Sequence, residues 1–242
     1  VKALWIEMFE DKESYVDHYM SSSWKHNRVL LLLRGEEIVS MLHLNPYTCI
    51  VQGERLDLHY IVGVCTKKAE QGKGYMGQLV MEALRICKED GEPFTYLMPA
   101  AEAIYRPYDF VSAGWCDKFV IEAEEADPSL PQARWDAIVP ELGQAGSIQN
   151  VGNHTLQICP FDRWTAGQTK QLESFAAELP MDMHAAWTAA YFAETDQQMK
   201  CYDGELVAVW DQEKPIAIAA YLCEEDQSEA EITHVLAAKQ YQ

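Results

Sequence analysis

Three closely spaced glycines, Gly72, Gly74 and Gly77, separate a segment with the pattern of a strand from one with the pattern of a helix. The strand pattern is the Ile- and Val-rich stretch Tyr60–Thr66. Apolar residues then recur at helical spacing, up to an expected stop near Gly91: Met76, Leu79, Val80, Ala83, Leu84 and Cys87. A glycine loop that opens a helix gathers backbone N–H groups and the positive end of the helix dipole at one point. The pattern therefore predicts either a phosphate-binding loop or a tight turn without a ligand.

Other glycine-rich nucleotide loops fit this stretch less well. Residues 72–77 satisfy G-x-G-x-x-G, but dinucleotide-binding folds place those glycines directly after a strand of a βαβ unit. Here Lys67–Gln71 intervenes after Thr66, and the preceding strands are predicted to be joined by hairpins. A G-x-x-x-x-G-K-[S/T] loop is excluded, since Lys67 stands at its first glycine and Gly74 at its Ser or Thr. A kinase glycine-rich loop is not supported, because no H-R-D-L motif follows it in the sequence.

The charge balance limits the classes of partner. The 242 residues carry a formal net charge of -19. Nucleic acids and anionic membranes are not expected as partners, because binding them needs a basic face. An acidic surface either steers cationic ligands toward the chain or only keeps it in solution.

The cysteines and the apolar runs predict a location. Seven cysteines include no C-x-x-C pair and no close His partner, so no metal site is expected. Buried thiols of this kind fit a reducing, cytoplasmic setting. The longest aliphatic run, Val29–Leu33, is too short to span a bilayer, and no signal peptide is recognisable.

The residues before and after the glycine loop predict helices and antiparallel strands. The expected elements before it are helices Lys2–Phe9 and Asp11–Tyr19 and strands Arg28–Arg34, Ile38–Leu44, Tyr47–Gln52 and Leu56–Thr66. Asn45–Pro46 is expected to break the second strand. After the loop helix we expect a strand Phe94–Met98, a short helix Ala100–Tyr105 and a last strand Trp115–Ala123.

Prolines and glycines crowd together around residues 126–151, which predicts a linker. The part after it repeats the outline of the first, which suggests two related domains. Its expected elements are helices Ala166–Leu179 and His184–Ala193 and strands His154–Ile158, Met199–Tyr202, Glu205–Trp210, Ile216–Cys223 and Glu229–Leu236. The second part has no glycine loop of its own, so a single phosphate site is expected.

The glycine stretch resembles motif A of the GCN5-related N-acetyltransferase (GNAT) family, Q/R-x-x-G-x-G/A between a strand and a helix. Gln71–Met76 fits this motif, with Met76 in place of the usual small sixth residue. Tyr105–Phe110 resembles the later motif Y-x-x-x-G-F, with Asp109 in place of glycine. The departure at Met76 resembles the branch related to the enhanced-intracellular-survival aminoglycoside acetyltransferases.

This resemblance implies an α/β (α+β) chain with the acyl-CoA N-acyltransferase fold, a mixed, mostly antiparallel sheet flanked by helices. It covers residues 1–125 as an acetyltransferase domain, followed by the linker at 126–151. Residues 152–242 are expected to be a second, degenerate copy. The chain ends about where the second copy would need its own glycine loop, so a truncated second copy is expected, without the further C-terminal domain that this branch usually has.

The resemblance also implies the chemistry of the site. The co-substrate is acetyl-CoA, with no metal, and Tyr105 corresponds to the general acid that protonates the departing thiolate. Backbone groups around the loop are expected to hold the pyrophosphate, with Lys73 either assisting or only solvated, and three strand residues are expected to pair with the pantetheine arm. The cofactor-binding set is Val64, Cys65, Thr66, Gln71, Gly72, Lys73, Gly74, Tyr75, Met76 and Gly77. A general base is not identified; His43, His59 and Glu102 are the candidates near the site.

Two functions remain open at this point. One is acetyl transfer to a primary amine, in which a cationic small molecule suits the acidic chain. The other is an acetyl-CoA-binding or regulatory module that has lost transfer activity, which the departures at Met76 and Asp109 favour. The pocket for the amine is expected from the first two helices, the Tyr47–Leu58 hairpin and the second part. The resemblance further suggests a homo-oligomer.

Overall fold

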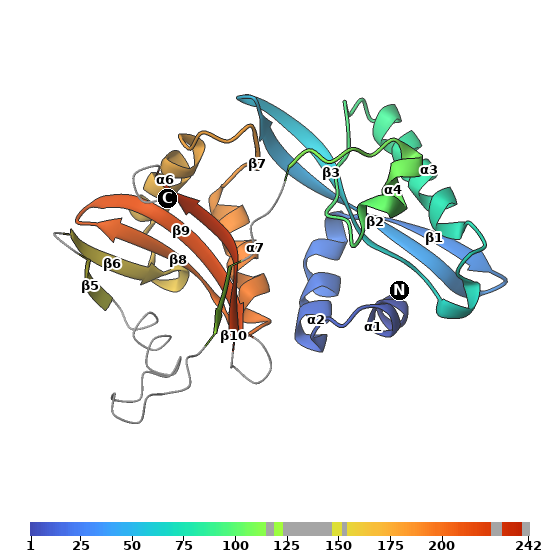
Figure 1. The fold of residues 1–242 in the computed structure, drawn as a ribbon, viewed down its shortest axis with the longest axis horizontal. Coiled ribbons are helices and arrows are strands. Elements are labelled where there is room, and N and C mark those ends of the chain that lie inside the picture. The colour runs from blue at the N-terminus through green and yellow to red at the C-terminus, as the bar shows by residue number, and fades with distance from the viewer. Residues whose placement is uncertain (115–118, 123–146, 152–153, 224–228, 239–242) are drawn as a thin grey trace. The chain divides into compact units, whose positions relative to one another are not determined.

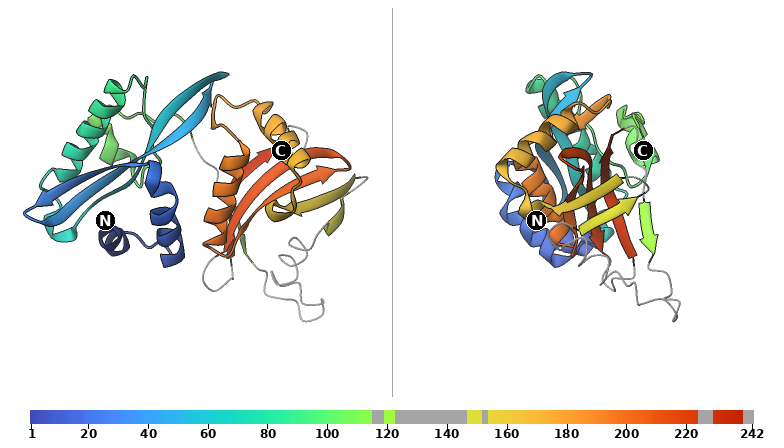
Figure 2. Two further views of the ribbon diagram at one scale, coloured as in Figure 1. Left: turned by 180° about the vertical axis from the view of Figure 1, so that it is seen from behind. Right: turned by 90° about the vertical axis from the view of Figure 1, so that its left-hand side faces the viewer.

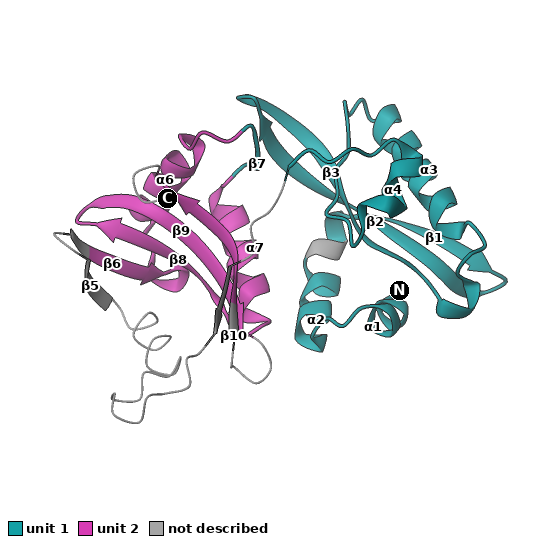
Figure 3. Ribbon diagram, in the orientation of Figure 1, with its two compact units in different colours: residues 1–116, 182–186 teal, residues 117–181, 187–242 magenta. Residues whose placement is uncertain are grey.

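The computed structural model describes residues 1–114, 119–122, 147–151, 154–223 and 229–238. Most of the predicted linker lies outside these described residues. The chain divides into two compact units, residues 1–116 with 182–186 and residues 117–181 with 187–242 (Figure 3). The first unit thus ends before residue 125 and takes one short segment from the second half of the sequence.

The first unit is a twisted antiparallel sheet with helices packed on it (Figure 1). Its strands run in the order β1-β2-β3, with β7 paired to the far end of β2. Its elements are helices α1 (Lys2–Met8), α2 (Glu13–Ser21), α3 (Tyr75–Glu89) and α4 (Glu102–Tyr105) and strands β1 (Arg28–Arg34), β2 (Glu37–Val51), β3 (Glu54–Thr66) and β7 (Met183–Ala185). The strands before the glycine loop are joined by hairpins, so this part of the prediction is confirmed.

Helix α3 runs along the β1–β3 sheet, as the opposite views of Figures 1 and 2 show. Its apolar stripe packs on one side of β2 and β3, against Leu42, Leu44 and Ile61. Met41, which alternates with Leu42, belongs instead to the cluster built by α1 and α2. This period of two places the loop helix on one face of the sheet and the first two helices on the other.

Two predictions about strands in the first unit are wrong. Pro46 does not end β2, which continues to Val51. The pairing of β1 with β2 ends at Leu44, so at Pro46 the strand is flanked by β3 alone. Proline has no backbone N–H to donate to a second neighbouring strand, so it is tolerated at such an edge position. Residues 94–98 are not a strand, since only a single parallel bridge joins Tyr96 to Tyr60.

The second unit is a sheet in the order β4-β10-β9-β8-β6-β5, with two helices on it. Its elements are strands β4 (Phe119–Glu122), β5 (Ser147–Val151), β6 (His154–Pro160), β8 (Glu205–Asp211), β9 (Lys214–Cys223) and β10 (Glu229–Ala237) and helices α6 (Ala166–Ala177) and α7 (Ala189–Lys200). Leu172, Phe192, Leu206 and Ile218 lie at the centre of its core. The mixed α/β class is confirmed, with two sheets as a two-copy fold requires.

Several segments of the second half differ from their predicted form. The strand expected at the end of the first part, β4, pairs with β10 of the second unit. The segment predicted as a helix from His184 begins as strand β7, and its helix starts only at Ala189. Residues 199–202, predicted as a strand, instead end α7 and form the following turn. In each case, pairing with a distant segment or helix continuation outweighs the local pattern.

No helix in the described ranges is long and apolar enough to cross a membrane.

The attachment of α3 to the sheet makes a prediction about stability. Val80 is fully buried in the core, whereas the next residue, Met81, is 56% exposed. Val80→Ala removes buried methyl groups and leaves a cavity, so the free energy of unfolding should fall by about 2–3 kcal/mol. Met81→Ala, the control on the same helix, should change it by less than about 0.5 kcal/mol. Urea unfolding of both variants measures this, and equal effects would contradict the packing described.

Candidate functional site

The glycine loop leaves the first turn of α3 without a side-chain cap. Gly72 and Gly74 both adopt left-handed backbone conformations, with φ of 76° and 77°, and Gly74 is the N-cap of α3. Side chains rarely tolerate these angles, so glycine suits both positions. The first turn of α3 contains no acidic residue, and Gly74 has no side chain to accept its N–H groups. The helix therefore presents N–H donors and a positive dipole end that are not neutralised locally.

The side chain of Gln71 holds the loop in place. Its Nε2 donates to the carbonyl oxygen of Thr66 at 3.1 Å, across the short 3₁₀ turn Lys68–Glu70. The backbone N–H of Lys67 donates to the carbonyl of Val39 at 2.9 Å, which ties the start of the turn to β2. The predicted residue Gln71 thus positions the loop from the side of β3, and its own contact with a ligand stays a prediction.

A buried carboxylate pairs with the loop lysine. The side chain of Glu70 is 5% exposed and lies 2.8 Å from the Nζ of Lys73. Its other oxygen contacts the guanidinium of Arg34 on β1. Lys73 is thereby tethered to a carboxylate that it shares with Arg34, although its side chain is 45% exposed. The backbone of the loop, rather than this lysine, is the stronger candidate for holding an anion.

Strand β3 contains a bulge where it approaches the loop. Met41 pairs with Cys65 and His43 with Val62, so Gly63 and Val64 together face the single residue Leu42. Such a bulge bends the strand and re-aims its backbone groups. In the described part of the chain, the outer edge of β3 has one bridge, at Tyr60, and no partner strand beyond it.

The three predicted pantetheine-binding residues, Val64, Cys65 and Thr66, lie on this open part of β3. Such an edge can accept an extended ligand as it would accept another strand. The thiol of Cys65 belongs to the core, and burial raises its pKa to about 12. Ser40 donates from its hydroxyl to the carbonyl of Cys65 at 2.8 Å, which fixes this part of β3 against β2.

The candidate acid, Tyr105, ends helix α4 next to the start of α3. Its ring packs on the same core cluster as Val64 and Met76, and its centroid lies 5.7 Å from that of Phe110. Burial, followed by the nearby Tyr60, raises the pKa of Tyr105 above its usual value. The phenol is therefore protonated at neutral pH and able to donate. The structure brings this residue together with the loop helix, while its catalytic role stays a prediction.

The 3₁₀ turn Arg106–Tyr108 that follows α4 rests on the first turn of α3. A Cβ atom placed on Gly77 would lie 2.3 Å from the hydroxyl oxygen of Tyr108. Glycine at this position therefore allows a close approach between the segment of Tyr105 and the loop helix. Asp109, which replaces the glycine of the related motif, adopts the left-handed region with φ of 63°. Aspartate is among the residues that tolerate this region, so the turn is retained.

The three candidates for a general base have separate roles in the structure. His43 is fully buried, with its Nδ1 2.9 Å from the hydroxyl of Tyr19, and burial lowers its pKa to about 4. His59 contacts the carboxylate of Glu92. Hydrogen bonds from Ser112 and Arg106 lower the pKa of Glu102. His43 has the character of a core residue, and the other two are held by neighbouring side chains.

A group of tyrosines includes Tyr60, which contributes to the raised pKa of Tyr105. Ring centroids of Tyr47 and Tyr60 lie 6.2 Å apart, and those of Tyr60 and Tyr96 lie 5.2 Å apart. Burial raises the pKa of Tyr15, with a contribution from Asp11 and smaller ones from neighbouring tyrosines. The sequence predicts a pocket from the first two helices, the Tyr47–Leu58 hairpin and the second part, and only Tyr15 and Tyr47 of these rings lie in those segments. Tyr60 and Tyr96 join them through tertiary contacts, which no local pattern indicates.

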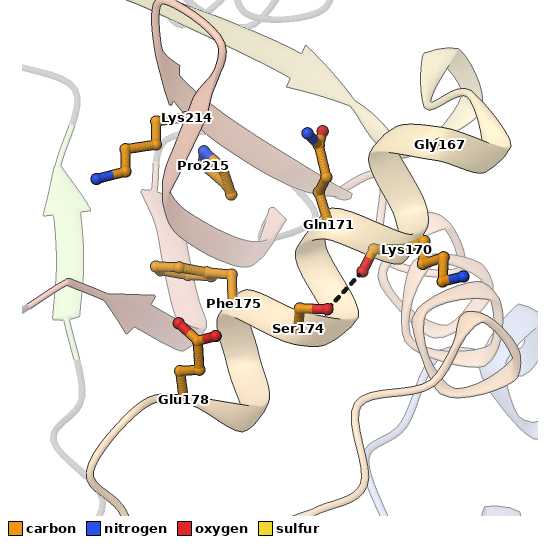
Figure 4. Close-up of a pocket in the computed structure, with 8 residues that line it drawn as sticks. All are labelled: Gly167, Lys170, Gln171, Ser174, Phe175, Glu178, Lys214 and Pro215. Atoms are coloured by element: carbon orange, nitrogen blue, oxygen red, sulfur yellow. Dashed lines mark hydrogen bonds between the residues drawn. The ribbon is translucent and has the colours of Figure 1, made fainter.

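A shallow hollow on the second unit is lined by none of the candidate site residues. Figure 4 shows it between α6 and the start of β9, with Phe175 and Pro215 on its inner side and Lys170 directed away. The hydroxyl of Ser174 donates to the carbonyl of Lys170 at 3.1 Å, a bond within the helix. Its lining is Gly167, Lys170, Gln171, Ser174, Phe175, Glu178, Lys214 and Pro215.

Comparisons with known proteins give a family for the first part of the chain. Residues 1–113 match the family model "Acetyltransferase (GNAT) domain". No curated protein sequence matches the chain at a significant level. A probable N-acyltransferase from Enterococcus faecalis has 14% identity and a TM-score of 0.61, over 92% of this chain and 52% of its own.

Two further structures share the fold. A GCN5-related N-acetyltransferase from Anabaena variabilis has 14% identity and a TM-score of 0.58, over 99% of this chain and 56% of its own. Eis1 from Mycobacterium abscessus has 12% identity and a TM-score of 0.51, over 90% of this chain and 52% of its own. At these identities the likeness establishes the fold, and the chain spans about half the length of the structures that it matches.

The contact between Gly77 and Tyr108 makes a prediction. Gly77→Ala should displace the Tyr108 segment, so that the free energy of unfolding falls by about 1–3 kcal/mol, as for other overpacked sites. Tyr108→Phe removes the oxygen that lies 2.3 Å from the new Cβ. The double variant should therefore recover at least half of the loss, because the closest clash is gone. Alanine then also favours a helix over glycine by about 1 kcal/mol. Chemical unfolding of the single and double variants tests this; additive losses would contradict the contact.

Proposed function

We propose that this chain, whose residues 1–113 belong to the GNAT family of acetyltransferases, is an N-acetyltransferase that moves an acetyl group from acetyl-CoA to a primary amine. The observation that carries the proposal is the junction between β3 and α3. There the open edge of β3 is followed, after a short 3₁₀ turn and the glycine loop, by a helix N-terminus that lacks a side-chain cap. An extended ligand with a phosphate at one end can use both features.

The residues at this junction fit acetyl-CoA as the co-substrate, which supplies a thioester. Backbone N–H groups from Gly72 to Gly77 would bind its pyrophosphate, and the edge of Val64, Cys65 and Thr66 would pair with its pantetheine arm. An N–H near Val64 would stabilise the negative charge that develops on the thioester oxygen. The rigid attachment of this edge to β2 supports such a role, because preorganised donors need no rearrangement during the reaction.

Tyr105 would act as the general acid. As the amine nitrogen bonds to the acetyl carbon, the bond from that carbon to sulfur breaks, and the hydroxyl proton of Tyr105 passes to the sulfur. The proton lost by the amine leaves through a separate base or water. The raised pKa of Tyr105 supports this role, since the acid form is the one present at neutral pH.

The tyrosine group and the charge of the chain favour a cationic amine. Faces of tyrosine rings attract ammonium groups, with a gain of about 0.5–2 kcal/mol for each well-placed pair. The net charge of -19 adds long-range attraction. We further propose a cytoplasmic setting, supported by the six cysteines of the described ranges, which are thiols rather than disulfides. Assembly into a homo-oligomer stays a prediction.

The activity is tested by release of CoA thiol from acetyl-CoA across a panel of amines. Polyamines, aminoglycosides and diamines should support release, and matched neutral alcohols should not. Binding of acetyl-CoA without release by any amine would instead favour the module that has lost transfer activity. No binding of acetyl-CoA would overturn both functions. Ionic strength adds a control, because steering by an acidic chain should weaken as salt is raised.

Tyr105→Phe tests the role of the acid. Phenylalanine keeps the ring that packs near Phe110 but has no proton to donate. We expect kcat to fall by about 10²–10⁴-fold, while the Kd for acetyl-CoA changes little. Steady-state kinetics and calorimetric titration measure the two quantities separately. Turnover equal to that of the unmodified chain would remove Tyr105 from the mechanism and leave it a packing residue.

A further inference from the structure

A buried group of three side chains that the proposed reaction does not use lies at the C-terminal end of α3. It consists of His59 on β3, Cys87 on α3 and Glu92 just after the helix. One ligand atom from each lies within 4.8 Å of those of the other two. Cys87 is 3% exposed, and the side chains of His59 and Glu92 are 14% and 6% exposed. A thiol, an imidazole and a carboxylate thus converge at the edge of an apolar core.

The end of the helix brings Cys87 and Glu92 together. The N–H of Glu92 donates to the carbonyl of Cys87 at 3.0 Å, and that of Gly91 donates to the carbonyl of Lys88 at 3.1 Å. With Gly91 in the left-handed region, these two bonds form a Schellman motif. The motif returns the chain over the last turn of α3, so the separation of the two side chains is set by the backbone.

The strand side of the group is held equally firmly. The carboxylate of Glu92 accepts the backbone N–H of His59 at 2.8 Å, and its other oxygen contacts Nδ1 of the same residue. The hydroxyl of Thr95 donates to the carbonyl of His59 at 2.6 Å. His59 is therefore fixed through its main chain as well as its ring. Residues that orient metal ligands act in this way, since they set the direction of each ligand before the ion binds.

We propose that His59, Cys87 and Glu92 form a binding site for one zinc-class divalent ion, which would fasten the end of α3 to β3. Ligands about 2.0–2.3 Å from a tetrahedral zinc ion lie roughly 3.3–3.8 Å from one another. The observed group is close enough to reach this geometry by small side-chain shifts. Three protein ligands would leave the fourth position to water. Mixed sulfur, nitrogen and oxygen ligands favour zinc or cobalt over magnesium or calcium.

Metal binding requires a deprotonated thiol and a free imidazole lone pair. On binding, the Cys87 thiol releases its proton to solvent, and His59 offers the lone pair of Nδ1 with its ring proton on Nε2. Glu92 exchanges its contact with the ring for a bond to the ion and can keep its hydrogen bond to the main chain. The sequence predicted no metal site because no cysteine has a close His partner along the chain. Here the partner comes from a neighbouring strand.

The test uses the full chain, reduced and freed of metal by a chelator, with Co²⁺ and Zn²⁺ as probes. A single equivalent of Co²⁺ should produce a thiolate-to-cobalt charge-transfer band, and Zn²⁺ should abolish it by competition. The melting temperature should rise with the logarithm of Zn²⁺ concentration above the Kd. Mg²⁺ should cause neither change. Absence of the band, or a band without competition by Zn²⁺, would overturn the proposal.

Variants locate the site. Cys87→Ser should lose the band, while Cys201→Ser, a thiol control in the second unit, should keep both band and affinity. Glu92→Gln should weaken Co²⁺ binding by at least the roughly 10–100-fold that loss of an orienting partner causes. Circular dichroism checks folding. If Cys87→Ser is unfolded, Glu92→Gln and His59→Gln decide the matter: unchanged cobalt affinity in both would overturn the site.

Discussion

The unsatisfied N–H groups at the start of α3 are the constraint on which the first unit depends. A helix leaves its first N–H groups without partners, and here no capping side chain takes them up. Gly72 and Gly74 supply the backbone angles that open the turn, and Gln71 ties it to Thr66. The buried face of α3 fixes the direction of the helix relative to β3. The positive end of the helix is thereby held beside an open strand edge, where an anionic, extended ligand can use both.

The sequence predicts this part of the fold well because its signals are local. The apolar spacing of α3 and the glycines before it lie within one short stretch, and neither depends on distant residues. The continuation of β2 through Pro46 cannot be read in the same way, since it depends on where β1 ends. Strands β4 and β7 pair with partners far along the sequence, so a local pattern cannot assign either one to its sheet.

The same distinction applies to the candidate site. Resemblance to known motifs singles out the loop and Tyr105, and the structure packs Tyr105 on the same core cluster as Met76, at the start of the loop helix. It also gives Lys73 a buried acidic neighbour, Glu70, three residues earlier in the chain. The tyrosine group and the His59–Cys87–Glu92 group need tertiary contacts between strands and helices. They were missed because the residues that make each group are scattered along the chain.

In the second unit, by contrast, side chains cap the N-termini of both helices. Thr165 accepts the N–H of Gln168 at 3.2 Å, and the side chain of Gln168 accepts the N–H of Thr165 at 2.9 Å, which closes a capping box at the start of α6. Thr188 accepts the N–H of Tyr191 at the start of α7. These side chains occupy donors that a phosphate would need. The two helices of the second unit are therefore capped by their own side chains, whereas the first N–H groups of α3 have no side-chain partner. For these three helices, the difference in capping supports the proposal that acetyl-CoA binds to the first unit.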